Sequence, residues 1–297
     1  MRFIIAFLFL FPFAVTAQLQ WKQVDSAYGN FPANSHLYYT ESLIDGKPNR
    51  AYYVAVEVQQ KKVEVATAVG DGKRYTPTQY FEHNAQPFVV VNTTFFEFVK
   101  NRNLNIVMNN GELVAYNMHT IVGRGKDTFT YRHPFASAFG ISKRRKMDIA
   151  WTYTDSSKKV PYATQMPIGA YKDSLNYLST AAFDKTAFKK WKMRTAVGGG
   201  PVLVQNGEIK ITNNEEIKFA GKAIYDKHPR TAIGYTADGK LIILVVEGRN
   251  PGRAEGADLV QNLDGGGSSC MLINGKETIK VSDKEGQRPV PAVLLVR

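Results

Sequence analysis

The stretch Val260-Gln261-Asn262-Leu263-Asp264-Gly265-Gly266-Gly267-Ser268-Ser269-Cys270-Met271-Leu272 decides how this chain of 297 residues is interpreted. Its apolar flanks predict a short strand ending at Asp264 and another starting near Cys270. Glycine loses more backbone entropy on folding than any other residue, so three in a row indicate a close approach of the backbone to another group. Their N–H groups could bind an anion, with Asp264 beside them as an acid, base or metal ligand. Ser268 and Ser269 could donate to phosphate or sugar oxygens. The alternative is a tight hairpin loop with an Asp turn residue.

Other polar residues stand at the ends of predicted apolar strands, namely Asn92, Arg230, Glu247 and Arg249. Together with Asp264 they supply two carboxylates and two guanidiniums, which suit glycosyl or phosphoryl chemistry. One carboxylate could protonate a leaving oxygen while the other acts as base or nucleophile, and the arginine fork matches phosphate geometry. Each residue alone could be a solvated strand end or an ion pair, and it is the set that favours a site.

The composition, with 44% hydrophobic and 22% charged residues, is that of a globular chain able to bury a core. The net charge of +12 is spread along the chain, with local clusters at 143–146 and 189–190. Since no nucleic-acid-binding module accompanies this charge, we expect no nucleic-acid partner. A basic surface would attract anionic envelope polymers or phosphorylated glycans. The single cysteine, Cys270, excludes an intramolecular disulfide and is interpreted as a buried thiol, because no activating base lies near it in the sequence.

The N-terminus has the features of a secretory signal peptide over residues 1–17, with Gln18 as the mature start. An uncleaved anchor is the weaker interpretation, because its apolar run is shorter than the ~20 residues that a membrane span needs. No later stretch is apolar enough to span a membrane. We therefore expect an exported protein, periplasmic or secreted.

The apolar pattern predicts an α+β fold dominated by strands, with strand-rich mixed sheets and a few flanking helices in a single domain. A strand-rich lead-in at 18–87 precedes the main part at 88–297. Helices are predicted from Thr76 to about His83 and from Thr180 to Met193. The continuous apolar run 87–92 predicts a central strand. Hairpins are predicted for 51–58 with 63–67, 105–116, 135–141 with 147–151, 197–205 onward through Asn206-Gly207, and 230–235 with 241–246, and a last strand for 289–296.

The basic cluster 143–146 is expected at a charged hairpin tip. The histidines show no metal-ligand spacing, and His228 is interpreted as structural or exposed. There is no nucleophile-elbow serine, phosphate-binding lysine loop or zinc motif, so we predict neither metal nor cofactor.

Five blocks in order resemble the phosphodiester glycosidase family, over residues 88 to the C-terminus. They are Val91-Asn92-Thr93-Thr94-Phe95-Phe96, Val197-Gly198-Gly199-Gly200-Pro201-Val202-Leu203-Val204, Pro229-Arg230-Thr231-Ala232-Ile233-Gly234, Val246-Glu247-Gly248-Arg249 and Asn262 to Ser269. The fourth is usually Asp-Gly-Arg in this family, so Glu247 is a longer acid than is common.

The resemblance implies a hydrolase that cleaves a sugar 1-phosphodiester, releases the sugar and leaves a phosphomonoester. It implies Glu247, Asp264, Arg230 and Arg249 as catalytic residues. It places the substrate against Asn92, Gly199, Gly200, Gly265, Gly266, Gly267, Ser268 and Ser269.

One departure from the family pattern is the short connection Gly256-Ala257-Asp258-Leu259, which runs directly into the strand before Asp264. Relatives carry a helix there, and a parallel crossover needs a dozen or more residues. A missing helix would expose apolar surface, so we expect lower stability than in full-length relatives. This keeps open a catalytically impaired protein that binds phosphorylated glycans. An ordinary glycosidase, indifferent to phosphate, is the third alternative, against which the arginine pair argues.

Overall fold

The computed structural model describes residues 19–44, 46–123, 130–169, 171–173, 187–221, 226–249 and 263–297, with the backbone alone for 171–173. The predicted signal peptide at 1–17 and the shortened segment at 250–262 lie outside these residues. No described helix is long and apolar enough to cross a membrane.

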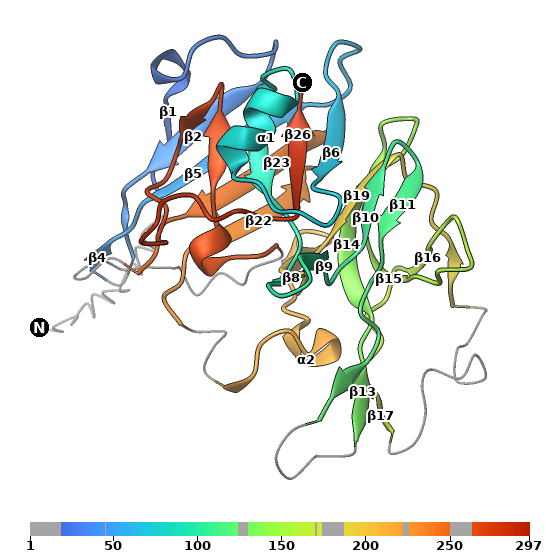
Figure 1. Cartoon of the computed structure of the whole chain (residues 1–297). Helices are drawn as coiled ribbons and strands as arrows, with labels where there is room; N and C mark the ends of the chain where they lie inside the picture. Colours follow the sequence, from blue (N-terminus) through green and yellow to red (C-terminus); the bar gives the residue numbers. More distant parts are fainter. Residues whose placement is uncertain are drawn as a thin grey trace, which may run out of the picture.

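Three large sheets form the body of the molecule (Figure 1). The first sheet has the order β1 (Lys22–Gln23), β2 (His36–Thr40), β5 (Ala51–Glu57), β23 (Lys240–Val246), β22 (Arg230–Tyr235). The second sheet has the order β25 (Lys276–Glu277), β24 (Met271–Ile273), β7 (Val89–Asn92), β26 (Ala292–Val296), β6 (Val65–Val69). The third sheet has the order β11 (Glu112–Ala115), β10 (Val107–Asn109), β19 (Thr195–Gly198), β14 (Ala136–Ile141), β15 (Met147–Tyr153), β16 (Tyr162–Thr164), β18 (Lys189–Lys190).

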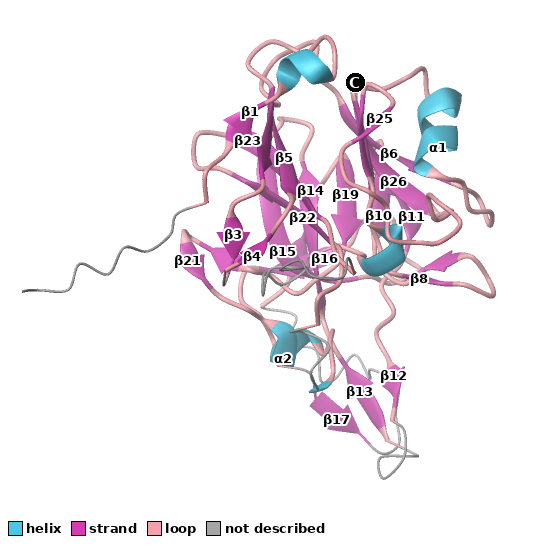
Figure 2. Cartoon of the chain, turned by 90° about the vertical axis from the view of Figure 1, so that its left-hand side faces the viewer, coloured by secondary structure: helices cyan, strands magenta, loops and turns pink. Residues whose placement is uncertain are grey.

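Smaller strand groups decorate this body, and Figure 2 shows one of them projecting from it. The projecting sheet has the order β12 (Ile121–Val122), β13 (Tyr131–His133), β17 (Tyr171–Asp173). The two-stranded pairs are β3 (Leu43–Ile44) with β4 (Lys47–Pro48), β8 (Phe96–Glu97) with β9 (Arg102–Asn103), and β20 (Val204–Gln205) with β21 (Glu208–Ile209). The described helices are α1 (Pro77–His83) and α2 (Asn213–Glu216), with 3-10 turns at Asp25–Ala27 and Gly266–Ser268. The α+β, strand-rich, single-domain prediction is confirmed.

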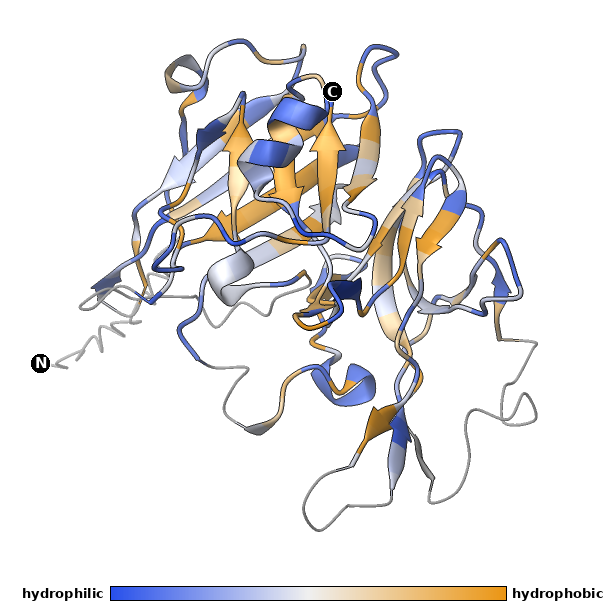
Figure 3. Ribbon diagram, viewed as in Figure 1, coloured by the Kyte–Doolittle hydropathy of each residue, from blue (hydrophilic) through white to orange (hydrophobic). Residues whose placement is uncertain are grey.

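The main core lies between the first two sheets. Val54 and Leu241 of the first sheet and Val91 and Leu294 of the second are fully buried in one cluster, as expected where the inner faces of two sheets pack together. Helix α1 covers the opposite face of the second sheet, where Tyr80 packs in a separate cluster. Figure 3 shows the largely hydrophilic surface of α1 in front of these hydrophobic strands. Strand β7 lies between β24 and β26, so the prediction of a central strand at 87–92 is confirmed.

Helix α1 begins where the sequence predicts. Thr76 accepts a hydrogen bond from the Gln79 N–H at 3.2 Å, and the Gln79 side chain accepts one from the Thr76 N–H at 2.9 Å. This reciprocal capping box, with Pro77 at the first helical position, satisfies amide groups that have no partner inside the helix.

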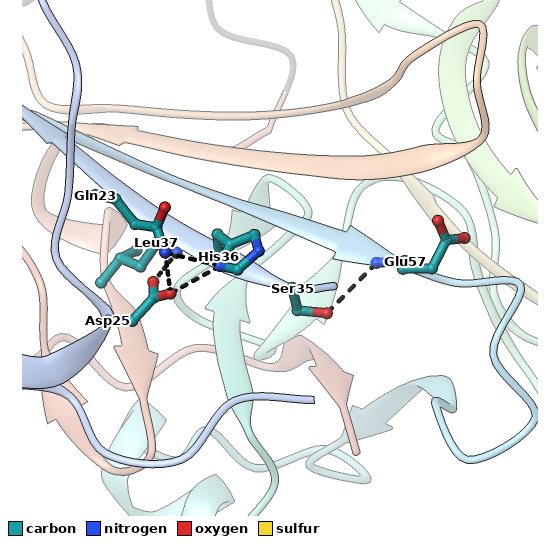
Figure 4. Close-up of polar contacts among 6 residues, drawn as sticks. All are labelled: Gln23, Asp25, Ser35, His36, Leu37 and Glu57. Carbon is teal, nitrogen blue, oxygen red and sulfur yellow. Dashed lines mark hydrogen bonds and ion pairs between the residues drawn. The ribbon is translucent and has the colours of Figure 1, made fainter. Parts of the chain in front are cut away.

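Hydrogen bonds to one carboxylate fix the edge of the first sheet (Figure 4). Asp25 accepts from the Leu37 N–H at 2.7 Å and from Gln23 Nε2 at 2.6 Å, and its Oδ2 lies 2.8 Å from His36 Nδ1. Burial acts to raise the pKa of Asp25, but these contacts outweigh it and lower the pKa. Ser35 extends the network by accepting from the Glu57 N–H.

Several predicted hairpins are confirmed, including 105–116 with its turn at Asn110-Gly111, where both residues have positive φ. The pairs β14–β15, β20–β21 and β22–β23 also form as predicted. The hairpin predicted for 51–58 with 63–67 is wrong, because β5 belongs to the first sheet and β6 to the second. Two apolar runs joined by a short polar turn do not reveal whether the chain pairs with itself or crosses between sheets.

The chain between β5 and β6 is fixed instead by Arg145, from the basic cluster 143–146, which lies at the tip of the β14–β15 hairpin as predicted. Its Nη1 donates to the carbonyls of Val58 at 2.6 Å, Gln60 at 2.7 Å and Val63 at 2.6 Å. Its Nη2 donates to Lys61 O at 3.1 Å. One guanidinium thus satisfies four carbonyls of the crossing.

Replacing Arg145 by Met should lower the free energy of unfolding by about 2–4 kcal/mol, because hydrogen bonds to a charged group are lost and carbonyls lose their donor. Denaturant unfolding of the variant beside the exposed Arg144→Met measures this, and the control should stay within about 0.5 kcal/mol of the parent. Equal losses in both variants would contradict a specific role for Arg145.

Two further predictions are wrong. The helix expected over 180–193 fails over its described part, where β18 and a loop occupy 187–193; Trp191 packs into the third sheet, so tertiary burial overrides the helical spacing. No strand ends at Asp264: Leu263 and Asp264 are in loop conformation. The parallel crossover expected before Asp264 is not formed by the described strands. Strands β23 and β24 belong to different sheets, and every described strand pair is antiparallel. The stability effect of the 250–262 segment stays a prediction.

Candidate functional site

The glycine loop, Gly265–Ser269, lies at the junction of the first and second sheets. Its approach is fixed by Leu263 N–H donating to Thr231 O at 3.2 Å and Asp264 N–H donating to Thr93 O at 2.7 Å. The Gly266 N–H donates to Pro229 O at 2.9 Å, and residues Gly266–Ser268 form a 3-10 turn, drawn in orange at the lower edge of the sandwich (Figure 1). Hydrogen bonds therefore hold the loop and the residues before it against the start of β22 and the end of β7. The interpretation as a simple hairpin turn is wrong.

Asn92, at the end of β7, holds these segments together. Its Nδ2 donates to Asp264 O at 2.6 Å, and its Oδ1 accepts from Cys270 N–H at 3.1 Å and from the Thr231 hydroxyl at 2.9 Å. The side chain is fully buried. Its amide oxygen and nitrogen are thus both engaged within the protein, an arrangement that suits positioning of the loop.

Two arginines lie against the glycines of the loop. Gly266 has a φ of +61°, and a Cβ at this position would stand 3.0 Å from Nη2 of Arg249. A Cβ on Gly267 would collide with the guanidinium of Arg288. The left-handed φ favours glycine at position 266, and both glycines let an arginine side chain approach the loop backbone closely. We call Arg249 and Arg288 the loop arginines.

Asp264 is the carboxyl group at the entrance of the loop. Its Oδ1 accepts from the Gly265 N–H at 3.0 Å. Burial raises the pKa of Asp264 to about 7, although the nearby Ser268 hydroxyl and the positive charge of Arg288 act to lower it. A carboxyl group that titrates near neutral pH is suited to proton transfer in catalysis.

The two serines of the loop have different surroundings. Ser269 is fully buried, and its hydroxyl lies 3.2 Å from that of Thr231. Ser268 is equally buried, but within the described part of the chain its Oγ has no hydrogen-bond partner of normal geometry. Buried hydroxyls are normally paired, so Ser268 is the loop hydroxyl best suited to meet a bound group.

Arg230 begins β22 beside the loop. Its Nη2 donates to Asp226 O at 2.7 Å, and its guanidinium lies 5.6 Å from the centre of the Phe219 ring. Burial lowers the pKa of Arg230, with repulsion from Arg249 adding to the effect and Asp226 opposing it. Arg230 and Arg249 therefore form a concentrated positive charge, which favours an anion.

His228 orients one of the loop arginines. Arg249 Nε donates to His228 Nδ1 at 3.1 Å, and His228 Nε2 lies 3.6 Å from Asp226 Oδ2. Burial lowers the pKa of His228, and Arg249 and Arg230 lower it further. A neutral ring accepts from Arg249, so His228 positions that guanidinium.

Glu247 makes its described contacts away from the loop. Its Oε1 accepts from the Lys280 N–H at 2.9 Å and from Arg50 Nη1 at 3.4 Å, and the residue is buried. Its N–H donates to Arg50 O. These contacts join the end of β23 to the start of β5 and to the chain after β25, as a structural ion pair would.

Gly199 and Gly200 lie in a different wall. Gly199 N–H donates to Ser137 O at 3.0 Å. Gly200 has a φ of +104°, and a Cβ there would collide with the carboxylate of Glu216 and lie 2.9 Å from Cε of Lys218. Gly199 and Leu263 both line a cavity of about 670 Å³ between the third sheet and the strands β22 and β23. This cavity lies between the block 197–204, which contains Gly199 and Gly200, and Leu263, the residue before Asp264.

Sequence reasoning missed Arg288, Lys218, Phe95 and Phe219. Arg288 directly precedes the strand predicted for 289–296, but only the contact with Gly267 shows that it meets the loop. Lys218 and Phe219 follow a helix too short to be predicted. Of these four residues, only Phe95 could have been found from the sequence, because it lies inside the family block 91–96. Among the described residues, no group of three or more His, Cys, Asp or Glu side chains could hold a metal ion.

Comparison with known proteins bears on this arrangement. The family model described as phosphodiester glycosidase matches residues 85–297. The chain belongs to the phosphodiester glycosidase family. The matched range contains the glycine loop, the loop arginines and Asn92, so every residue of the site described above falls inside the family domain.

Solved structures show the same fold as this phosphodiester glycosidase. The catalytic domain of zebrafish N-acetylglucosamine-1-phosphodiester alpha-N-acetylglucosaminidase is 19% identical, with a TM-score of 0.57 over 95% of this chain and 89% of that chain. A hypothetical protein from Synechocystis is 14% identical, with a TM-score of 0.55 over 94% of this chain and 68% of that chain. No curated protein sequence matches significantly. At the level of the family, the chain is a hydrolase of phosphodiester-linked sugars.

Proposed function

We propose that this protein hydrolyses a sugar 1-phosphodiester at the glycine loop, releasing the sugar and a phosphomonoester. The observation that carries the proposal is Asp264, whose carboxyl group has a pKa raised to about 7 beside a glycine loop flanked by two arginines. A base and an anion-binding surface thus stand next to each other, as cleavage of a glycosyl phosphate requires.

In the proposed reaction Asp264 acts as general base. It takes a proton from a water molecule whose oxygen attacks the anomeric carbon. The bond between that carbon and the phosphate oxygen breaks, and its electron pair leaves on the phosphate. The N–H groups of Gly265, Gly266, Ser268 and Ser269 are already bonded within the protein, so the predicted anion site on these amides does not form. The Ser268 hydroxyl, Arg230 and the loop arginines hold the increasing negative charge instead, which is how preorganised donors accelerate such steps.

The leaving group explains why one carboxylate could suffice. A phosphomonoester is a weak base, so its departure needs charge stabilisation more than protonation. The contacts of Glu247 with Arg50 and Lys280 favour a positioning role for this residue. We therefore propose Asp264 with Arg230 and Arg249 as the reactive set, and Glu247 and Asn92 as supports. Gly199 and Gly200 would line the adjacent wall.

The cellular context of the proposal is export, with envelope or other glycans as substrates. It is supported by the signal-peptide pattern of residues 1–17 and by the net charge of +12, which attracts anionic polymers.

The proposal is tested with residues 18–297 and a panel that pairs sugar 1-phosphodiesters with O-glycosides of the same sugars. We expect turnover of the phosphodiesters alone. Equal turnover of both classes would identify an ordinary glycosidase. Binding of the phosphodiesters without turnover would identify a phosphoglycan-binding protein, the alternative that the shortened segment before Asn262 keeps open.

The loop arginines give a sharper prediction. Arg249→Met and Arg288→Met should each lower kcat/KM for a phosphodiester about 100- to 1,000-fold, the loss expected when one donor to the developing charge is removed. The exposed Arg144→Met serves as control and should keep the parent rate. Unchanged kinetics in both loop variants would place the phosphate elsewhere.

A further inference from the structure

Lys218 is a half-buried cation that lies beside Gly200, in the block 197–204. Its Nζ lies 5.0 Å from the centre of the Phe95 ring, and its Cε lies beside Gly200. Phe95 belongs to the block 91–96, which also carries Asn92. The lysine therefore belongs to the same region as the site but is absent from the mechanism above.

The backbone around Lys218 is rigidly built. Ile217 has a φ of +50°, a left-handed conformation that is rare for a β-branched residue. Asn213 clamps the next turn, since its Oδ1 accepts from the Phe219 N–H and its Nδ2 donates to Phe219 O, both at 2.9 Å. Strained, over-determined backbone of this kind is found where a side chain must be held for function.

The ammonium group of Lys218 makes no hydrogen bond or ion pair with any described residue, and its described partner is an aromatic face. The nearby carboxylate, Glu216, is already occupied by five donors, from Ser137 (N–H and hydroxyl), Trp151, Val202 and Thr212. Burial lowers the pKa of Lys218 to about 8, with Glu216 opposing this. The lysine remains mostly charged at neutral pH, with its donors available to a ligand.

Lys218 is also separate from the arginines. The rings of Phe95 and Phe219 stand edge to face with centres 6.2 Å apart; Lys218 lies on Phe95 and Arg230 on Phe219. The charged groups that shift the pKa of Arg230 are Asp226 and Arg249. The charged group that shifts the pKa of Lys218 is Glu216. The site therefore offers two cationic positions with an aromatic pair between them.

We propose that Lys218 binds a second anionic group of the substrate, in addition to the phosphate held by the loop arginines. The substrate class is then a sugar 1-phosphodiester with a further phosphate or carboxylate, on the sugar or on the aglycone. This inference rests on the proposed function, because it takes the arginines as the position of the scissile phosphate.

Calorimetric titration with substrate-like glycosyl phosphates tests this, because it measures binding and not turnover. The probes are α-D-glucose 1-phosphate, α-D-glucose 1,6-bisphosphate and a methyl-capped α-D-glucose 1-diphosphate, which place the second phosphate on the sugar or on the aglycone side. The parent protein should bind one of the two probes with a second phosphate about 10- to 100-fold more tightly than the 1-phosphate.

Lys218→Met should remove that preference while keeping the affinity for α-D-glucose 1-phosphate. Lys218→Arg should retain it, and so should the control Lys190→Met, which removes an exposed lysine of β18. Equal parent affinity for all three probes would overturn the inference, as would a Lys218→Met variant that loses all three equally. If the parent binds none of the probes and cleaves no phosphodiester, the proposed function itself fails.

Discussion

Replacing Asp264 by Asn will lower turnover of a sugar 1-phosphodiester by about 100- to 10,000-fold while leaving the fold intact. General-base catalysis contributes about 100- to 10,000-fold, and Asn cannot take the proton. The amide oxygen can still accept from the Gly265 N–H, so the loop keeps its conformation. Steady-state kinetics beside the exposed Asp238→Asn measures the effect, and the control should match the parent.

The Asp264→Asn variant should also change how the free energy of unfolding depends on pH. The folded pKa of Asp264, about 7, is raised above its ordinary value of 3.8. The folded state therefore binds the proton more tightly than the unfolded chain, and the resulting stability is present below about pH 4 and lost as pH rises to about 7. The parent should lose about 2–4 kcal/mol across this range, and Asp264→Asn should not.

Denaturant unfolding at pH 4.5 and pH 8 tests this sign. Asp264→Asn should be more stable than the parent at pH 8, and the two should converge toward pH 4.5. A variant that is inactive but shows the parent's pH dependence would separate the catalytic role from the raised pKa. A fully active variant would remove Asp264 from the chemistry.

Replacing Glu216 by Gln will lower the free energy of unfolding by about 3–5 kcal/mol, despite the near-identical shape. Oε2 accepts from the Ser137 N–H and Oε1 from the Val202 N–H, each at about 3 Å. Either orientation of the new amide therefore points an NH₂ group at a backbone N–H. The Trp151 indole and the Thr212 hydroxyl also donate to Oε1, so the conflict cannot relax by a simple rotation.

The matched control is the neighbouring Glu215→Gln, which is less buried and should change stability by less than about 0.5 kcal/mol. Denaturation midpoints of the two variants give the comparison. A Glu216→Gln protein within 1 kcal/mol of the parent would show that these hydrogen bonds do not hold the wall at Gly200.

Local patterns in the sequence predicted those parts of the fold that depend on neighbouring residues. The capping box of α1, the Asn110-Gly111 turn and the apolar run of β7 are examples. What could not be predicted is which sheet a strand joins. The residues after β5 read as a hairpin, and only the four carbonyls gathered by Arg145 show that the chain crosses to the second sheet.

The site divides in the same way. The glycine run alone fitted a tight turn as well as a site, and it was the set of polar strand ends and the family resemblance that favoured Asp264 as a site residue. Strand ends also suggested Glu247, yet its described partners are Arg50 and Lys280. Arg288 acts on the loop from 21 residues beyond Gly267, through a contact that no spacing rule describes. Long-range packing decides which polar strand ends meet.

The position of β7 has a consequence for biosynthesis. This strand pairs only with β24 and β26, which lie within the last 27 residues of the chain, and Asn92 bonds to partners 172 and 178 residues away. Residues 93–270 are therefore synthesised while this apolar strand has no neighbour to pair with. Such distant pairing makes folding slow and leaves the growing chain prone to aggregation. We expect newly made chains to depend on a holding factor until β24 and β26 have been synthesised.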